Sequence, residues 1–288
     1  MMKVGLSTYS LSRAVADGEM TFLDTVKWIA DNGGEHVEIS SGKINLTEEP
    51  ALVEAIRKQA DVSGIDVSDY AIGAQFVQPD EASYEAEIAR VMKHVDVAHA
   101  LGVKLMRHDV ASRPIPEATL VNFIADLPKL ADACRRIADY AAQYGITTSV
   151  ENHGYYIQHS DRVQALVHAV GRDNYRTTLD IGNFMCADEN SVVATKKNLP
   201  IASMVHIKDF YLRPFHQNPG EGWFRTAGGN YLRGAIVGQG DIDIRTVLKA
   251  IKDSGYDGYL SIEFEGKEAC TYGSKVGMEN VRRIWDEV

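Results

Sequence analysis

Short apolar runs that alternate with longer amphipathic segments are the feature that most constrains the fold of this chain. Between the runs, apolar residues recur at helical spacing, as at Ile88, Val91, Met92 and Val95. Eight strand-then-helix units in 288 residues are typical of a (β/α)8 TIM barrel, a fold of the α/β class. The eight predicted strands are Lys3–Leu6, His36–Ile39, Asp66–Ala71, Lys104–Arg107, Thr147–Val150, Thr177–Leu179, Ser203–Ile207 and Tyr259–Ile262.

The main alternative is a doubly wound open sheet, which usually carries a glycine-rich nucleotide loop after its first strand. Here the first predicted strand continues into STYS (7–10) without a GxGxxG pattern, so the barrel is favoured. The whole chain, 1–288, is predicted to form one domain. Residues 212–241 lack helical periodicity and are predicted to form a long loop over the barrel mouth. Such a loop is a lid, a binding loop, an oligomer contact or an ordered surface insertion.

Ligand-type side chains stand where four consecutive predicted strands end. TTSVENHG presents Glu151, TTLDIGNF presents Asp180, MVHIKDF presents His206 and LSIEFEG presents Glu263. Because the carboxyl ends of barrel strands converge on the axis, these side chains can share one ion. Taken singly, each is explained equally well as a helix cap or a packed histidine, but four in succession favour a metal site. Three carboxylates and one imidazole suit a divalent ion, with Mn²⁺ first and Mg²⁺ or Co²⁺ as alternatives.

Charge and composition argue against several other classes of function. With 40 acidic and 30 basic residues the net charge is −10, which disfavours nucleic acid as a partner. No apolar run is long enough to span a membrane, and the first residues do not resemble a secretory signal. Three widely spaced cysteines, Cys134, Cys186 and Cys270, are expected to be reduced thiols. A cytoplasmic location is therefore expected.

Several of these motifs together resemble the xylose-isomerase-like TIM-barrel superfamily. The run from Gly238 to Gly266, with VHIKDF, LDIGNF and VENHG, is most similar to its sugar phosphate isomerase/epimerase group, which includes ketose 3-epimerases. The resemblance covers nearly the whole chain. It implies that Glu151, Asp180, His206 and Glu263 are metal ligands, and that Glu151 and Glu263 also transfer protons.

The chemistry of these residue types agrees with that role. A divalent cation bound to a carbonyl and an adjacent hydroxyl stabilises the enediolate formed when the neighbouring C–H loses its proton. Two carboxylates on opposite faces of the sugar then act as base and acid and invert the carbon between them. The leading expectation is therefore a metal-dependent isomerase or epimerase acting on a small sugar or keto-sugar.

Other positions depart from the ketose 3-epimerases. Those enzymes place a histidine where this chain has Asn183 and a glutamate where it has Ile157. This chain offers other candidate acids and bases: His153, which is a candidate catalytic residue, together with His108 and Lys208. An additional acid or base is what a lyase needs to remove a C2 proton from a 3-keto-glycoside or cyclic keto-polyol and expel a leaving group. C-glycoside-cleaving and inosose-dehydrating members of the superfamily resemble that description, and a lyase is the alternative reading.

Substrate contacts are less sharply indicated. Tyr9 and Trp223 are expected to stack on a sugar, and Glu38 to hydrogen-bond a sugar hydroxyl. For the histidines and Lys208 the structural explanations are hydrogen bonds to the metal ligands and a salt bridge to Asp209 or Glu263. The set of predicted substrate-binding residues is His108, Asn183, Lys208, Tyr9, Glu38 and Trp223.

Two further classes stay open. A DNA-repair phosphodiesterase of the AP-endonuclease type resembles this chain in fold, but that family uses a histidine-rich cluster of several zinc ions and a basic DNA groove. The net charge of −10 and the single histidine of the seventh strand disfavour it. A non-catalytic sugar-binding barrel is the other. A homo-oligomer, formed through residues 212–241 or 276–288, is also a possible arrangement.

Overall fold

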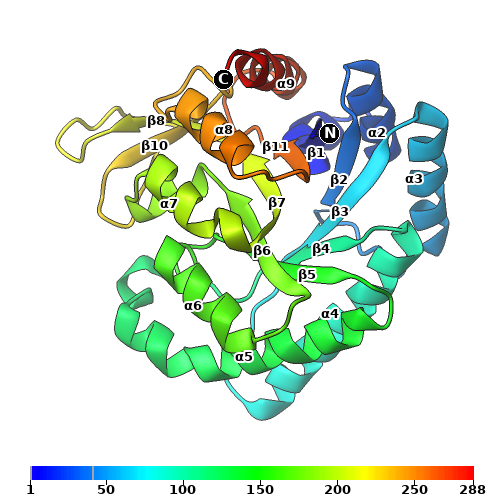
Figure 1. Cartoon of the computed structure of the whole chain (residues 1–288), viewed down its shortest axis with the longest axis vertical. Coiled ribbons are helices and arrows are strands. Elements are labelled where there is room, and N and C mark those ends of the chain that lie inside the picture. Colours follow the sequence, from blue (N-terminus) through cyan, green and yellow to red (C-terminus); the bar gives the residue numbers. More distant parts are fainter. Residues whose placement is uncertain (1, 41) are drawn as a thin grey trace.

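A closed barrel of parallel strands forms the centre of the chain in the computed structural model, which describes residues 2–40 and 42–288. The strand order is β1-β11-β7-β6-β5-β4-β3-β2, and helices surround the ring (Figure 1). The predicted (β/α)8 barrel is confirmed. Its strands are β1 (Lys3–Ser7), β2 (His36–Ser40), β3 (Asp66–Ile72), β4 (Leu105–His108), β5 (Thr147–Glu151), β6 (Tyr175–Asp180), β7 (Ala202–Ile207) and β11 (Tyr259–Ile262).

Each of the eight predicted strands is present, with ends that differ by at most two residues. The largest difference is β6, which begins at Tyr175 rather than Thr177. Tyr175 pairs with Thr148 of β5, so the ladder extends beyond the apolar run. Strand ends depend on pairing with a neighbour that is remote in sequence, whereas the apolar run is local.

Sequence signals define the helices between these strands. Thr21 and Asp24 form a reciprocal capping box at the start of α2, and Gly64 and Gly102 end α3 and α4 with φ of 70° and 80°. The helices are α1 (Ser12–Ala16), α2 (Phe22–Asp31), α3 (Pro50–Ser63), α4 (Glu81–Leu101), α5 (Leu120–Ala142), α6 (Ser160–Val170), α7 (Ser191–Asn198), α8 (Ile244–Asp253) and α9 (Cys270–Glu287), with 3₁₀ turns η1 (Thr8–Leu11), η2 (Ile115–Glu117), η3 (Asn183–Ala187) and η4 (Leu199–Ile201).

The main core lies between the barrel and its helices. Strand residues such as Leu6, Ile39, Met106 and Val150 are fully buried there. The three cysteines are buried and free, as expected. In the described ranges, no helix is both long and apolar enough to cross a membrane. This packing fixes the strands, so the side chains at their carboxyl ends have a rigid support.

The segment predicted as a long loop contains regular structure. Strands β8 (Asp209–Arg213), β9 (Phe224–Arg225) and β10 (Tyr231–Ala235) form a separate antiparallel sheet with β10 in the middle. In Figure 1, β8 and β10 extend to the left of the ring. We call residues 209–235 the arm. Helical periodicity is absent from residues 212–241, but a loop without strands was the wrong interpretation, because antiparallel pairing is not visible in one strand alone.

Polar contacts attach the arm to segments that follow barrel strands. The Tyr155 hydroxyl, after β5, donates to the Arg225 carbonyl over 2.7 Å. After β6, the Asp188 carboxylate accepts from the Gly228 amide at 2.5 Å and from the Asn230 side chain at 2.8 Å. The arm is thereby held on the side of the barrel where the strands end.

Asp188→Gly should loosen the arm without unfolding the barrel. The substitution removes the carboxylate, while glycine readily adopts the left-handed backbone that Asp188 has, with φ of 57°. We expect proteolytic cleavage within residues 214–230 to accelerate severalfold, and the melting temperature to change little. Limited proteolysis with mass spectrometry measures this. Asp173→Gly, in an exposed turn, is the matched control; equal cleavage of both variants would contradict the role of Asp188.

Candidate metal centre and active site

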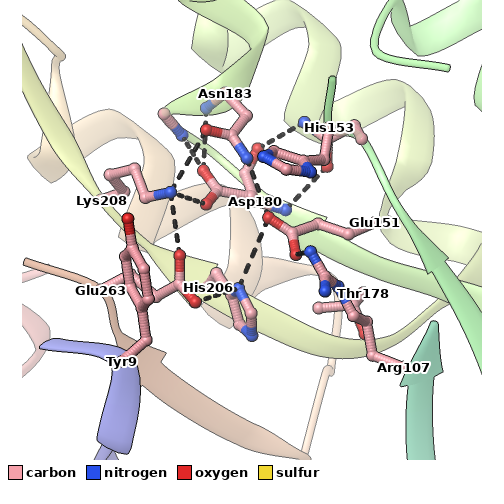
Figure 2. A network of polar contacts seen from close by, with 12 residues as sticks. Tyr9, Arg107, Glu151, His153, Thr178, Asp180, Asn183, His206, Lys208 and Glu263 are labelled. Atoms are coloured by element: carbon pink, nitrogen blue, oxygen red, sulfur yellow. Dashed lines mark hydrogen bonds and ion pairs between the residues drawn. The ribbon is translucent and has the colours of Figure 1, made fainter. Parts of the chain in front are cut away.

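Four buried side chains meet at the carboxyl ends of β5, β6, β7 and β11. They are Glu151, Asp180, His206 and Glu263, and one potential ligand atom from each lies within 4.8 Å of the other three (Figure 2). We call this group the four-residue cluster. The sequence predicted these four residues as ligands, and the barrel brings them together from positions up to 112 apart because parallel strands end at one face.

Asp180 is held with one oxygen directed to the cluster. Its Oδ1 accepts hydrogen bonds from the amides of Gly182 and Asn183, at 2.7 and 2.8 Å. The Asn152 side chain bridges to the backbone of Asp180 on both sides, donating to its carbonyl and accepting from its amide. These bonds leave Oδ2 as the carboxylate atom available to an ion.

His206 is oriented by a second buried carboxylate. Its Nε2 lies 2.6 Å from Oε2 of Glu38. Its Nδ1 has no hydrogen bond and lies 3.5 Å from Glu263 and 3.8 Å from Glu151. Burial opposes protonation, but Glu38 and Glu263 raise the pKa of His206 to about 10. Glu38, predicted to contact a sugar hydroxyl, is fully buried and contacts His206 instead of facing open space.

Two cations, the buried Lys208 and the partly buried Arg107, balance the carboxylates. Arg107 forms ion pairs with Glu151 and with Asp109, the latter at 3.1 Å. Lys208 Nζ lies 2.8 Å from Glu263 and 3.1 Å from Asp180. Burial tends to raise the pKa of Glu263, but Lys208 and His206 lower it to about 2. For Glu151 burial outweighs Arg107, and the pKa is raised.

Asn183 connects the two sides of this charge network. Its side-chain amide donates to Oε1 of Glu151 over 2.8 Å, and its oxygen accepts from Lys208 over 3.3 Å. The contact of Lys208 with Glu263 was one of the structural explanations given for it. Asp209, the other proposed partner, instead accepts amide hydrogen bonds from Phe210, Gly238 and Gly240.

The donor set fits one hard divalent ion. Bonds of about 2.1 Å place opposite ligands about 4.2 Å apart, which agrees with ligand atoms that all lie within 4.8 Å. Two of the donors are Nδ1 of His206, which has no hydrogen bond, and Oδ2 of Asp180, which lies 3.1 Å from Lys208. No cysteine is in the cluster, which disfavours a structural zinc site.

His153 stands at the rim of the cluster. Its side chain is 51% exposed, and its Nδ1 lies 3.3 Å from Oδ1 of Asp109. Burial lowers the pKa of His153, but Asp109 reverses the effect and the net shift is upward. Asp109, which the sequence did not single out, therefore links His153 through Arg107 to Glu151.

His108 does not join the site. Its ring is buried, packs against Phe76 and Tyr175, and makes its hydrogen bond with the carbonyl of Asp109. The neighbouring Arg107 contacts the cluster instead. Successive residues of a strand point to opposite faces, so the error is one position in register. Side chains alternate in direction along β4, and this alternation was the signal that could have identified Arg107 as the residue facing the site.

The two predicted stacking residues differ in position. Tyr9 is 41% exposed and its hydroxyl donates to Glu265 over 3.0 Å, beside Lys208. Trp223 is packed against the guanidinium groups of Arg213 and Arg233 in the arm. Glu265, two residues after Glu263 and thus on the same side of the chain, was also missed by the sequence reasoning.

Behind His206 lies one more buried acid. Asp69 of β3 pairs in register with Glu38 of β2, and neither of its carboxylate oxygens has a hydrogen-bond partner among the described residues. Burial and the charge of Glu38 raise the pKa of Asp69 to about 8. Asp69 is therefore protonated near neutral pH in the metal-free protein.

Metal content tests the cluster directly. The purified protein should bind about one divalent ion per chain, measured by elemental analysis after Mn²⁺ loading and removal of free metal. Asp180→Ala and His206→Ala should each abolish stoichiometric binding because each removes a donor. His168→Ala, an exposed histidine of α6, should retain it. A wild-type protein that binds no ion would refute the site.

Asp69 gives a pH prediction for the metal-free protein. Its folded pKa of about 8 exceeds the unfolded value of about 3.9, so its contribution to stability is lost as pH rises between these values. Asp69→Asn should therefore gain stability relative to wild type from pH 5 to pH 8, by up to about 1.4 kcal/mol per pH unit. Urea unfolding measures the difference. Asp173→Asn should show no trend, and a trend of opposite sign for Asp69→Asn would contradict the assignment.

Comparison with known proteins agrees with the barrel fold. A model of the family described as xylose isomerase-like TIM barrel matches residues 26–284. An inosose dehydratase of Clostridium perfringens (strain 13 / Type A) is 21% identical over 225 residues, 75% of each chain. These similarities extend across most of the barrel.

Solved structures with low sequence identity share the fold. D-psicose 3-epimerase, determined in the presence of D-fructose, superposes with a TM-score of 0.74 at 17% identity over 99% of both chains. The IOLI protein with a bound zinc atom gives 0.75 at 18% identity, over 99% of this chain and 97% of that one. With the family match covering most of its length, the chain belongs to the xylose isomerase-like TIM barrel family.

Proposed function

We propose that this protein uses a divalent metal ion, Mn²⁺ by preference, to remove the proton next to a carbonyl in a small keto-sugar or cyclic keto-polyol. The observation that carries the proposal is the four-residue cluster, with its buried carboxylates and free His206 Nδ1. Bound there, the ion would polarise the carbonyl and stabilise negative charge on its oxygen. The named relatives include enzymes that act on substrates of this kind.

Within this proposal, the protein side chains divide the work. Asp180 and His206 hold the ion, because backbone amides and Glu38 fix their orientations. Glu151 and Glu263 carry protons to and from carbon. The Lys208 ammonium, 2.8 Å from Glu263, adds positive charge where negative charge develops on the substrate.

Elimination is the outcome we favour after proton removal. Expulsion of a hydroxyl or larger group needs an acid near the leaving oxygen. Lys208 lies beside Glu263, and His153 lies at the rim with Asp109 at 3.3 Å. The chain also has Asn183 where ketose 3-epimerases carry a histidine, and its relatives include an inosose dehydratase.

Epimerisation is the second candidate, and a specific feature supports it. Inversion at carbon requires a proton carrier on each face. Glu151 and Glu263 come from β5 and from the end of β11, on either side of His206, and each is within 4 Å of its Nδ1. The structural likeness to D-psicose 3-epimerase is consistent with this outcome.

Phosphodiester hydrolysis is less well supported. The cluster contains a single histidine rather than a histidine-rich set, and the net charge of −10 opposes a DNA groove. A small-molecule substrate is therefore part of the proposal. Turnover of such a substrate distinguishes an enzyme from a barrel that binds sugar without catalysis.

Incubating the Mn²⁺-loaded protein with 3-keto-glucosides and inososes in D₂O separates these outcomes. Elimination gives an unsaturated ketone with new ultraviolet absorbance, whereas epimerisation gives an isomer carrying one deuterium, seen by NMR. Glu151→Gln and Glu263→Gln should each lower turnover by about 10³-fold or more, since each removes a proton carrier and a ligand.

Glu279→Gln, on the exposed face of α9, is the control and should match wild type. Exchange that survives in both active-site variants would mean that the proton is removed by another group. Tight sugar binding without exchange or product would support the non-catalytic barrel instead.

A further inference from the structure

A cavity of about 320 Å³ lies beside the four-residue cluster. Three parts of the chain enclose it: the first turn after β1, the segment after β11 and the arm. Its volume is in the range of pockets that bind small organic ligands. Its lining includes three aromatic and three cationic side chains: Tyr9, Phe224, Phe264, Arg13, Arg233 and Lys267.

Aromatic side chains are part of the lining of this cavity. Tyr9 is 41% exposed and Phe224 is 38% exposed, although both are large and partly apolar. Phe264, which is buried, lies at the base. Exposed rings beside a cavity leave faces free to stack on a flat ligand.

Positive charge dominates the same cavity. Arg13, Arg233 and Lys267 line it, and no ion pair of theirs with a carboxylate is found among residues 2–40 and 42–288. Arg13 donates to the Glu268 carbonyl and lies 5.9 Å from the centre of the Phe264 ring. The Arg233 guanidinium lies over the ring of Tyr211 at 4.9 Å, and its Nε is buried without a hydrogen bond. The acid in the lining, Glu265, is already engaged by other groups.

Those groups connect the cavity to the metal centre. One oxygen of Glu265 accepts from the Tyr9 hydroxyl at 3.0 Å and from Lys208 at 3.3 Å. Lys208 in turn lies 2.8 Å from Glu263 (Figure 2). A ligand that reaches Glu263 with its sugar part is therefore next to this cavity on the Tyr9 side.

We propose that the cavity binds an aromatic substituent with an acidic oxygen, a phenol-type group, carried by the substrate of the metal centre. The rings of Tyr9 and Phe224 stack on the aromatic group, and Arg13, Arg233 and Lys267 attract its negative oxygen. This inference rests on the proposed function for the sugar part. It narrows the substrate class to aryl-substituted keto-sugars rather than unsubstituted polyols.

Binding of 4-nitrophenol tests the cavity independently of turnover. The metal-loaded full-length protein is titrated by calorimetry with 4-nitrophenol, at a pH where it is ionised, and with cyclohexanol. We expect 4-nitrophenolate to bind and cyclohexanol to bind at least tenfold more weakly. Phe224→Ala should weaken 4-nitrophenolate about fivefold to tenfold through loss of stacking. Lys267→Gln should weaken it severalfold and leave cyclohexanol unchanged.

Matched controls come from residues outside the cavity. Phe215→Ala removes another exposed phenylalanine of the arm, and Lys275→Gln removes an exposed lysine of α9; both should bind as wild type does. Equal affinity for the two probes, or unchanged 4-nitrophenolate affinity in both Phe224→Ala and Lys267→Gln, would overturn the assignment. If 4-nitrophenolate binds as expected but no keto-sugar exchanges deuterium, the proposed function is refuted. The assignment of the cavity as a binding site for an acidic aromatic group then stands.

Discussion

Three carboxylates buried within a few ångströms of one another are the constraint on which this site depends. Like charges repel strongly in a poorly hydrated interior, and each loses the solvation it has in water. The barrel compensates with Arg107 beside Glu151 and Lys208 between Asp180 and Glu263. What negative charge remains is suited to a divalent ion, and this balance explains why the cations are buried together with the acids.

Compensation extends outward in layers of hydrogen bonds. Glu38 orients His206, and Asp69, a protonated acid near neutral pH, lies behind Glu38. Asn183 donates to Glu151, the partner of Arg107, and accepts from Lys208, so it connects the two cations of the site. Such supporting contacts fix the orientation of the side chains that would hold the ion. The site is consequently part of the barrel interior rather than a loop feature.

The arm adds a different surface to this rigid centre. It is held by Tyr155 and Asp188, and it contributes Phe224 and Arg233 to the cavity that Tyr9 also lines. Carboxylates therefore dominate the metal centre, whereas aromatic rings and cations that lack a carboxylate partner dominate the adjoining cavity. A substrate with a keto-sugar at one end and an acidic aromatic group at the other matches both environments.

The sequence by itself determined the barrel, its eight strands and the four residues of the cluster. Apolar periodicity and strand-end position are local properties, and a closed parallel barrel brings all strand ends to one face. Only the tertiary structure decided which of two neighbours faces the site: Arg107 rather than His108, and Phe224 rather than Trp223. It also placed Glu38 behind His206. A one-residue change in register reverses the direction of a strand side chain, and the pairing that sets register joins residues far apart in sequence.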